Sequence, residues 1–318
     1  MSSDEKPSGS CGTKTGSTNR VVAVASGKGG VGKTVCTANL AMQTAARRVT
    51  LAVDLDIGCG NLNTCLGVKF PSRSIDDFMG SRAASLLDVR LDTGVKQLQL
   101  ISCSYRPSRS ISLTQVQKQQ ILEELRYGDS EFTFVDLGAG VHADILDFFS
   151  AADVKVLVTT PESLSMHNAF VFLKSLIYRT LFRELEREQA LQAIQKKLSE
   201  VLYSNGELPV TQIVDRMRAW DRYSAYIVQG LIQELKIHVL FNMMLRETEK
   251  KFVTNFYNLV KKHLGLDVML FGLVPYDKSL KESVQSLVPF AMQYPQAPAA
   301  RAFKDLSLKL ENCLVASQ

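Results

Sequence analysis

Short apolar runs recur along the chain, and stretches with apolar residues at helical spacing separate them. Seven runs of four to six residues are predicted as strands, because buried parallel strands are continuously apolar rather than alternating. Strands and helices that alternate in this way predict an α/β fold, with a mostly parallel twisted sheet flanked by helices. The predicted strands are Val21–Ala25, Val49–Val53, Leu98–Ile101, Phe132–Val135, Val154–Val158, Val239–Asn242 and Met269–Val274.

Residues 33–47 and 165–178 are predicted as helices that follow the first and the fifth of these strands. Glycine, aspartate, threonine, proline and asparagine gather just after the strands. Because open parallel sheets bind ligands at the carboxyl ends of their strands, this edge of the sheet is the predicted location of a functional site.

The segment from about residue 181 to 235 interrupts this alternation, because it contains no predicted strand. Two apolar series predict two amphipathic helices, separated by Ser204-Asn205-Gly206. The favoured interpretation is a helical insertion that packs on the core, and the alternative is a subdomain that docks a partner or flanks a dimer. The series are Leu181, Leu185, Leu191, Ile194, Leu198 and Val201, then Ile213, Met217, Trp220, Tyr223, Ile227 and Leu231.

The composition is that of a soluble globular protein, with 46% hydrophobic and 22% charged residues among 318. Residues 1–19 are rich in Ser, Gly, Thr and Lys and predict a disordered tail, followed by a single domain over 20–318. No apolar run is long enough to span a bilayer and no secretory signal is recognised, so we expect a cytoplasmic protein with free thiols.

The segment GKGGVGKT has the GxxxxGK[ST] pattern of a P-loop and lies between a predicted strand and a predicted helix. Glycines let the backbone wrap a phosphate, so that successive N–H groups point at it beside the positive end of the helix. We expect Lys33 to reach the β- and γ-phosphates and the Thr34 hydroxyl to bind Mg²⁺. The predicted nucleotide-binding residues here are Gly27, Lys28, Gly29, Gly30, Val31, Gly32, Lys33, Thr34 and Val35.

The loop with its flanking serine, SGKGGVGKT, resembles the deviant Walker A motif of the MinD/ParA family, which includes the FleN/FlhG flagellar-number regulators. Further segments resemble the motifs of that family in the same order. They are Val53–Gly58 for switch I, Phe134–Gly140 for Walker B and switch II, Thr159–Ser163 for the TxPE segment, Phe241-Asn242 for the adenine-contacting asparagine, and Val274–Asp277 for the late (I/V)PxD segment.

The resemblance implies roles for four residues. Lys28 reaches the nucleotide of a partner subunit across a dimer sandwich, a role that the spacing alone does not indicate. Asp136 holds Mg²⁺ through water, and Asp56 positions or deprotonates the attacking water, because phosphoryl transfer needs mainly placement and charge neutralisation. Asp54 supports the water or the metal. The predicted metal ligands are therefore Thr34, Asp136 and Asp56, although an isolated Asp pair after a strand is more often a turn.

The same resemblance implies nucleotide contacts from four later residues. Gly138 donates its N–H to the γ-phosphate, so that switch II distinguishes ATP from ADP. Asn242 pairs with the adenine edge, with a simple strand-end turn as the alternative interpretation. Pro275 and Asp277 of the late segment complete the predicted nucleotide site.

The expected function is that of an ATPase that dimerises with ATP and Mg²⁺ and serves as a positioning switch for the division site or the flagellum. We expect slow intrinsic hydrolysis to ADP and stimulation by an unidentified activator or cargo protein. One alternative is a ParA-like ATPase that partitions DNA. A metal-cluster carrier is disfavoured, because the six cysteines contain no CxxC pair.

Two segments of the sequence are candidates for binding a membrane or DNA. The predicted helix Ala302–Val315 places Phe303, Leu306, Leu310 and Leu314 on one face; it packs on the core or, less favoured, lies weakly on the inner face of the membrane. DNA binding would need surface cations, and most of these alternate with acidic residues, which favours a solvated face. The candidate cations are Arg179, Arg183, Arg187, Lys196, Lys197, Arg216, Arg218 and Arg222.

Overall fold

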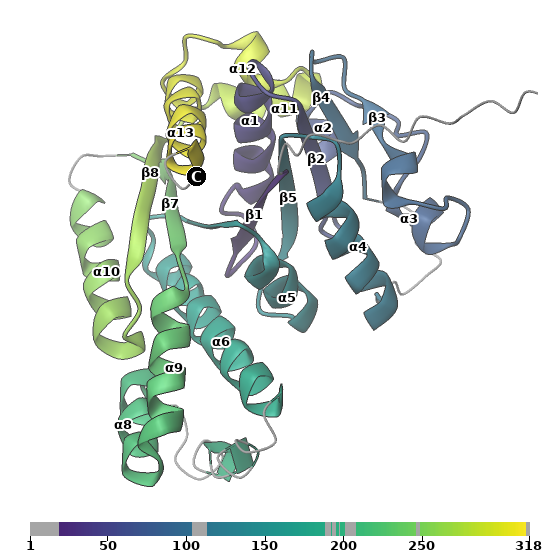
Figure 1. Cartoon of the computed structure of the whole chain (residues 1–318). Helices are drawn as coiled ribbons and strands as arrows, with labels where there is room; N and C mark the ends of the chain where they lie inside the picture. Colours follow the sequence, from purple (N-terminus) through teal and green to yellow (C-terminus); the bar gives the residue numbers. More distant parts are fainter. Residues whose placement is uncertain are drawn as a thin grey trace, which may run out of the picture.

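A computed structural model describes residues 19–103, 113–187, 192, 195–196, 198–200, 208–245 and 249–315. Within these residues, eight strands form one sheet in the order β3-β4-β2-β5-β1-β6-β7-β8 (Figure 1). All neighbours in the sheet are parallel except β3 and β4. The predicted fold, a mostly parallel sheet flanked by helices, is confirmed.

All seven predicted strands are present, most of them one to four residues longer than predicted. The eighth, β3, was missed because it has only two residues and alternates rather than being continuously apolar. The strands are β1 Arg20–Ser26, β2 Thr50–Leu55, β3 Leu91–Asp92, β4 Leu98–Ile101, β5 Phe132–Ala139, β6 Val154–Thr159, β7 Ile237–Met244 and β8 Val268–Pro275.

Two hydrophobic clusters cover the two faces of the sheet, and alternate residues of β1 separate them. Val22 and Val24 belong to the cluster under α1 and α13, whereas Ala23 and Ala25 belong to the cluster under α4, α5, α6 and α10. Burial on both faces is the physical reason that these strands are apolar throughout. The main helices are α1 Lys33–Ala45, α4 Gln115–Tyr127, α5 Ala143–Ala151, α6 Ser163–Arg187, α10 Lys250–Leu264 and α13 Pro298–Val315.

Shorter elements complete the layers, and several of them connect the sheet to the helices. They are α2 Leu62–Cys65, α3 Ile75–Met79, the 3₁₀ helix η1 Leu86–Val89, α8 Val210–Trp220, α9 Arg222–Glu234, α11 Ser279–Ser286 and α12 Phe290–Gln293. The described part begins at Asn19, which is buried and donates to the Leu125 carbonyl, although the sequence assigned this residue to the tail.

The insertion is helical in its described residues, but its second half differs from the prediction. One continuous helix was predicted over Ile213–Leu231, whereas the structure has two, α8 and α9, which meet at Asp221. The Asp221 carboxylate caps α9 by accepting from the N–H groups of Tyr223 and Ser224. The break rotates the predicted apolar face, so that the Tyr223 side chain is 64% exposed. The Ser204–Gly206 separator lies outside the described residues.

The C-terminal helix α13 packs against α1 and β8, and its apolar face is buried. Phe303 is fully buried, and Leu306 and Leu310 are buried with it. Arg47, just after the end of α1, donates to the Glu311 carboxylate from two of its nitrogens and so ties the two helices together. The described residues of this apolar face are therefore buried in the core and do not form a surface for a membrane. No described helix is long and apolar enough to cross a bilayer.

Replacing Phe303 with alanine should lower the free energy of unfolding by about 3–5 kcal/mol, because it removes a buried ring and leaves a cavity between α13 and the sheet. Urea unfolding followed by circular dichroism measures this change. Lys304→Ala on the exposed side of the same helix is the matched control and should change stability little. Equal effects of the two substitutions would contradict the packing of α13 on the core.

Candidate functional site

The loop from Gly27 to Gly32 connects the end of β1 to the first residue of α1. Gly30 and Gly32 have φ angles of +83° and +82°, a conformation that favours glycine. The space where a side chain of Gly29 or Gly30 would lie is open. Gly27 instead packs directly on the backbone of α6, because an added Cβ would lie 2.1 Å from the Asn168 carbonyl oxygen. The loop thus has an open concave side and a supported side, as a phosphate cradle requires.

A buried ion pair lies at the foot of this loop. The Lys33 Nζ is 2.7 Å from Asp136 Oδ1, and both side chains are almost completely buried. Neighbouring strands bring them together, because Val24 of β1 pairs with Asp136 of β5 and the loop to Lys33 begins three residues later, at Gly27. Thr37, one turn further along α1, also donates to Asp136 Oδ1, at 3.0 Å.

The second oxygen of Asp136 has no hydrogen-bond partner among the described residues, although it is completely buried. Burial raises the pKa of Asp136, opposed by the Lys33 ammonium and by the hydroxyls of Thr34 and Thr37. A buried carboxylate oxygen without a partner, beside a threonine hydroxyl, provides the hard oxygen donors that Mg²⁺ prefers. The residues present therefore fit the predicted metal, with Asp136 and Thr34 as the groups that would hold it.

The two predicted switch I carboxylates have different surroundings. Asp54 is fully buried, and its two oxygens accept from the N–H groups of Asp56 and Leu62, each at 3.0 Å. Asp54 of β2 stands opposite Asp136 of β5 in the sheet. Burial and the nearby negative charge of Asp136 raise the pKa of Asp54 to about 7. Asp54 therefore organises the loop 56–62, and Gly60 leaves room for it, because an added Cβ would lie 2.3 Å from Asp54 Oδ2.

Asp56 lies closer to the phosphate loop and is partly open to solvent. Its Oδ2 is 3.5 Å from Lys33 Nζ, and its side chain is 24% exposed. Gly138 of switch II leaves room beside it, because an added Cβ on Gly138 would lie 3.3 Å from Asp56 Oδ1. Gly140 of switch II donates to the carbonyl of Ser26 just before the loop. The structure thus brings Lys33, Asp56, Asp136 and Gly138 together.

Lys28 lies at the surface of the loop rather than beside Asp136. Its Nζ is 3.5 Å from the carboxylate of Glu162 in the Thr159–Ser163 segment, which was predicted as a family motif. The Lys28 side chain is 28% exposed and that of Glu162 is 70% exposed, so this ion pair is weak. Lys28 is therefore accessible to a group outside the chain.

The later predicted residues lie around the end of β7. Asn242 donates from Nδ2 to the carbonyl of Val31 in the phosphate loop, at 2.9 Å. Pro275 ends β8 beside Met244 of β7. Asp277 accepts from the N–H of Ser279 at the start of α11, so its carboxylate serves a turn there. Asn242 thus joins the phosphate loop directly, whereas no contact with that loop is observed for Pro275 or Asp277 in the part of the chain described.

Two residues of the site were missed from the sequence. Thr37 follows Lys33 by four residues and lies on the same side of α1, a spacing that could have predicted its contact with Asp136. Glu162 was quoted only as part of a motif, and its pairing with Lys28 depends on the loop geometry.

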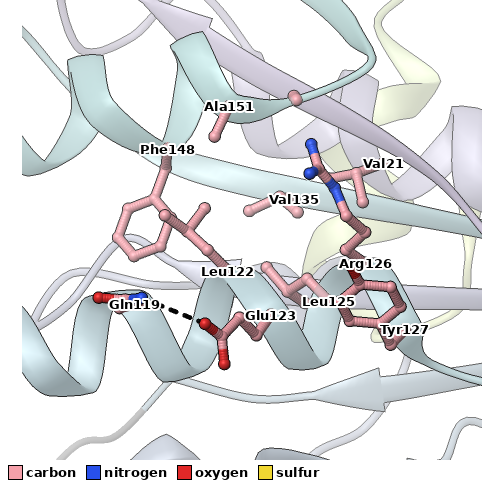
Figure 2. A pocket seen from close by; sticks show the side chains of 11 residues that line it. Val21, Gln119, Leu122, Glu123, Leu125, Arg126, Tyr127, Val135, Phe148 and Ala151 are labelled. Atoms are coloured by element: carbon pink, nitrogen blue, oxygen red, sulfur yellow. Dashed lines mark hydrogen bonds between the residues drawn. The ribbon is translucent and has the colours of Figure 1, made fainter.

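A prominent hollow of the structure lies elsewhere. Figure 2 shows a pocket between α4, α5 and the strands beneath them, lined by residues such as Leu122, Tyr127 and Phe148. Its volume is about 340 Å³. None of the predicted site residues lines it. The nucleotide site is thus identified by its side chains and backbone rather than by this cavity.

Comparison with known proteins agrees with this geometry. The model of the CobQ/CobB/MinD/ParA nucleotide binding domain matches residues 22–290. The chain belongs to this family. The matched range extends from β1 to the start of α12. It includes the phosphate loop, the two predicted switch segments and Asn242.

Relatives within the family include proteins of two kinds. A putative septum site-determining protein MinD of Oltmannsiellopsis viridis is 35% identical over 162 residues, which are 48% of each chain. The antiactivator FleN of Pseudomonas aeruginosa is 24% identical over 298 residues, covering 92% of this chain and 86% of FleN. The flagellum site-determining protein YlxH of Helicobacter pylori is 30% identical over 156 residues, or 49% and 53% of the chains. The chain spans about half the length of most of the curated relatives it matches.

Solved structures of the family share the fold. MinD complexed with Mg-ADP from Pyrococcus horikoshii superimposes with a TM-score of 0.64 at 20% identity, covering 93% of this chain and 97% of MinD. The MinC:MinD complex of Aquifex aeolicus gives a TM-score of 0.62 at 19% identity, covering 92% and 96%. A ParA family ATPase from Chlorobium tepidum gives a TM-score of 0.61 at 17% identity, covering 91% of this chain and 98% of the ATPase.

Proposed function

We propose that this chain is an ATP-dependent dimerising ATPase that acts as a positioning switch. The observation that carries the proposal is the placement of Lys33 between Asp136 and Asp56, at 2.7 Å and 3.5 Å, directly beneath an open glycine loop. One ammonium and two carboxylates at the N-terminus of a helix match what phosphoryl transfer needs, namely positioned charge of both signs.

Binding begins with an exchange of partners at Lys33. The loop N–H groups and the start of α1 attract the phosphates of ATP, and the Lys33 ammonium turns from the carboxylates toward them. Asp136 and Thr34 are the residues that would hold Mg²⁺, which would neutralise charge on the phosphates. The exchange keeps every buried charge paired, which avoids the cost of an isolated charge in the interior.

Asp56 is the residue that we assign to the attacking water. It is partly exposed, and its carboxylate lies beside the Lys33 ammonium. Asp54 has a positioning role, because its buried oxygens hold the backbone of residues 56 and 62. Asp56 and Gly138 lie close together, since a Cβ added to Gly138 would lie 3.3 Å from Asp56 Oδ1, and this proximity links the water site to switch II, so that the γ-phosphate changes both loops together.

Dimerisation follows from the position of Lys28. Its ammonium lies at the surface of the loop and pairs with the exposed Glu162 carboxylate, so it can exchange Glu162 for the phosphates of ATP in a second copy of the chain. ATP then lies between two protomers, and hydrolysis releases them. An activator or cargo protein would bind one of the two states, the monomer or the dimer, and so respond to the switch. The names of the relatives, which refer to division and flagellar sites, support such a role.

The Lys28→Ala variant tests this proposal. With Mg²⁺ and a non-hydrolysable ATP analogue, the wild-type chain should double its mass in light scattering, whereas Lys28→Ala should remain a monomer and still bind the analogue. Glu162→Ala is the matched control, since it removes the other half of the same exposed pair and should leave the dimer intact. A Lys28→Ala chain that dimerises like the wild type would refute the role in the partner site.

DNA partitioning is the weaker alternative for this surface. Among the candidate cations whose side chains the structure describes, Arg179 and Arg183 contact Asp147, and Arg218 contacts Asp215. These pairs reduce the positive charge available to phosphates along DNA. The alternative of a cluster carrier is disfavoured by the absence of a CxxC pair from the sequence.

A further inference from the structure

The end of β7 contacts the phosphate loop from behind. Asn242 is only 2% exposed, and its Nδ2 donates to the Val31 carbonyl at 2.9 Å. Val31 and Gly32 share one peptide unit, and no cis peptide bond occurs in the described chain. In a planar trans peptide the C=O and the following N–H point in opposite directions. Asn242 therefore fixes the direction of the Gly32 N–H, one of the donors available to a phosphate.

Gly32 is close to this side chain and to the next residue. An added Cβ on Gly32 would lie 2.4 Å from Asn242 Nδ2 and 3.3 Å from Met243 Cε. A side chain at position 32 would therefore displace both residues. The glycine is needed at this position for close approach as well as for its φ angle of +82°.

Met243 adopts a backbone conformation that is unusual for its residue type. Its φ angle is +58°, in the left-handed region that favours glycine. The β7–β8 ladder shifts at the same point, since Phe241 pairs with Leu273 and Met244 with Pro275, which leaves one extra residue in β7. Such bulges redirect side chains next to functional sites, and strained backbone persists where the surroundings impose it.

We propose that Asn242 and Met243 form a clamp that holds the phosphate loop in its binding conformation. The clamp acts on the phosphates whatever base is attached to them, so Asn242 is a positioning residue for the loop. This inference rests on the proposed function only for nucleotide binding and does not require hydrolysis or dimerisation. It differs from the expected adenine contact, which would use the amide oxygen Oδ1, a buried atom without a partner among the described residues.

Calorimetric titration with two probes, Mg-ADP and inorganic pyrophosphate with Mg²⁺, separates these roles. In Asn242→Ala the affinity for both probes should fall by about five- to tenfold, the worth of one hydrogen bond, with their ratio unchanged. Asn258→Ala removes an exposed amide on α10 and should change neither affinity. A loss confined to Mg-ADP would show a base contact and overturn the clamp, and so would wild-type affinity for both probes.

Met243→Gly provides a second test, which stays informative if Asn242→Ala folds poorly. Glycine adopts the same φ angle without strain, so the thermal midpoint should stay the same or rise. Pyrophosphate affinity should nevertheless fall, because the side chain beside Gly32 is lost. Unchanged affinity would overturn the role of Met243. A wild-type chain that binds neither probe would refute both the clamp and the proposed nucleotide site, whereas binding without an ATP-dependent dimer would refute only the switch.

Discussion

Replacing Lys33 with methionine should reduce ATP hydrolysis by at least about a hundredfold and should strongly weaken ATP binding. The substitution keeps most of the aliphatic stem but removes the ammonium that lies between Asp136 and Asp56. A single preorganised donor to a developing charge typically contributes 10²–10³ in kcat. Phosphate release measured in the presence of saturating Mg-ATP gives the rate, and calorimetry gives the affinity.

The buried position of Lys33 requires a control for folding. Its removal leaves the fully buried Asp136 without its cation, which destabilises the protein if that carboxylate stays ionised. Circular dichroism and the thermal midpoint of the variant should therefore be recorded beside its activity. Lys28→Met serves as the matched lysine control, and it should fold normally and bind the nucleotide. A folded Lys33→Met chain with wild-type hydrolysis would disprove the assignment of the phosphate site.

Replacing Asp56 with alanine should lower kcat by about 10²–10⁴, the usual contribution of a positioned acid or base. Unlike the change at Lys33, it should leave ATP binding nearly intact, since Asp56 is partly exposed and lies 3.5 Å from Lys33 rather than in the buried pair. Single-turnover hydrolysis and ATP titration distinguish the two effects.

A separate result would reassign the role of Asp56. If Asp54→Asn abolishes turnover while Asp56→Ala keeps it, the water would be positioned by the inner carboxylate. The structure favours Asp56, because both oxygens of Asp54 are already engaged by the backbone of the same loop. Asp54→Asn should mainly disturb the fold of residues 56–62, which proteolysis of that loop would detect.

The sheet could be predicted because burial on both faces leaves a continuous apolar signal in each long strand. Val22 and Val24 face one cluster and Ala23 the other, so no polar residue interrupts β1. The insertion was predicted less well, because its apolar spacing continues across Asp221, and only the capping contacts of that residue reveal the break between α8 and α9. Local capping therefore overrode the periodic pattern.

The phosphate loop was predictable for a different reason, since its chemistry demands glycines and a lysine at fixed spacing. The contacts that support it were not, because they join residues far apart in the chain. Asn242 was singled out for an adenine contact, whereas its contact with Val31 spans 211 positions and depends on a bulge that leaves no sequence pattern. The same holds for Lys28 and Glu162, which meet only once the fold has formed.

The central claim is that ATP, and not ADP, joins two copies of this chain. The most direct measurement is the solution mass of Asp56→Ala by light scattering, with Mg-ATP and with Mg-ADP, because blocked hydrolysis traps the ATP state. We predict a dimer with ATP and a monomer with ADP. A monomer in both, with ATP binding verified by calorimetry, would contradict the switch and leave a nucleotide-binding protein that works as a single chain.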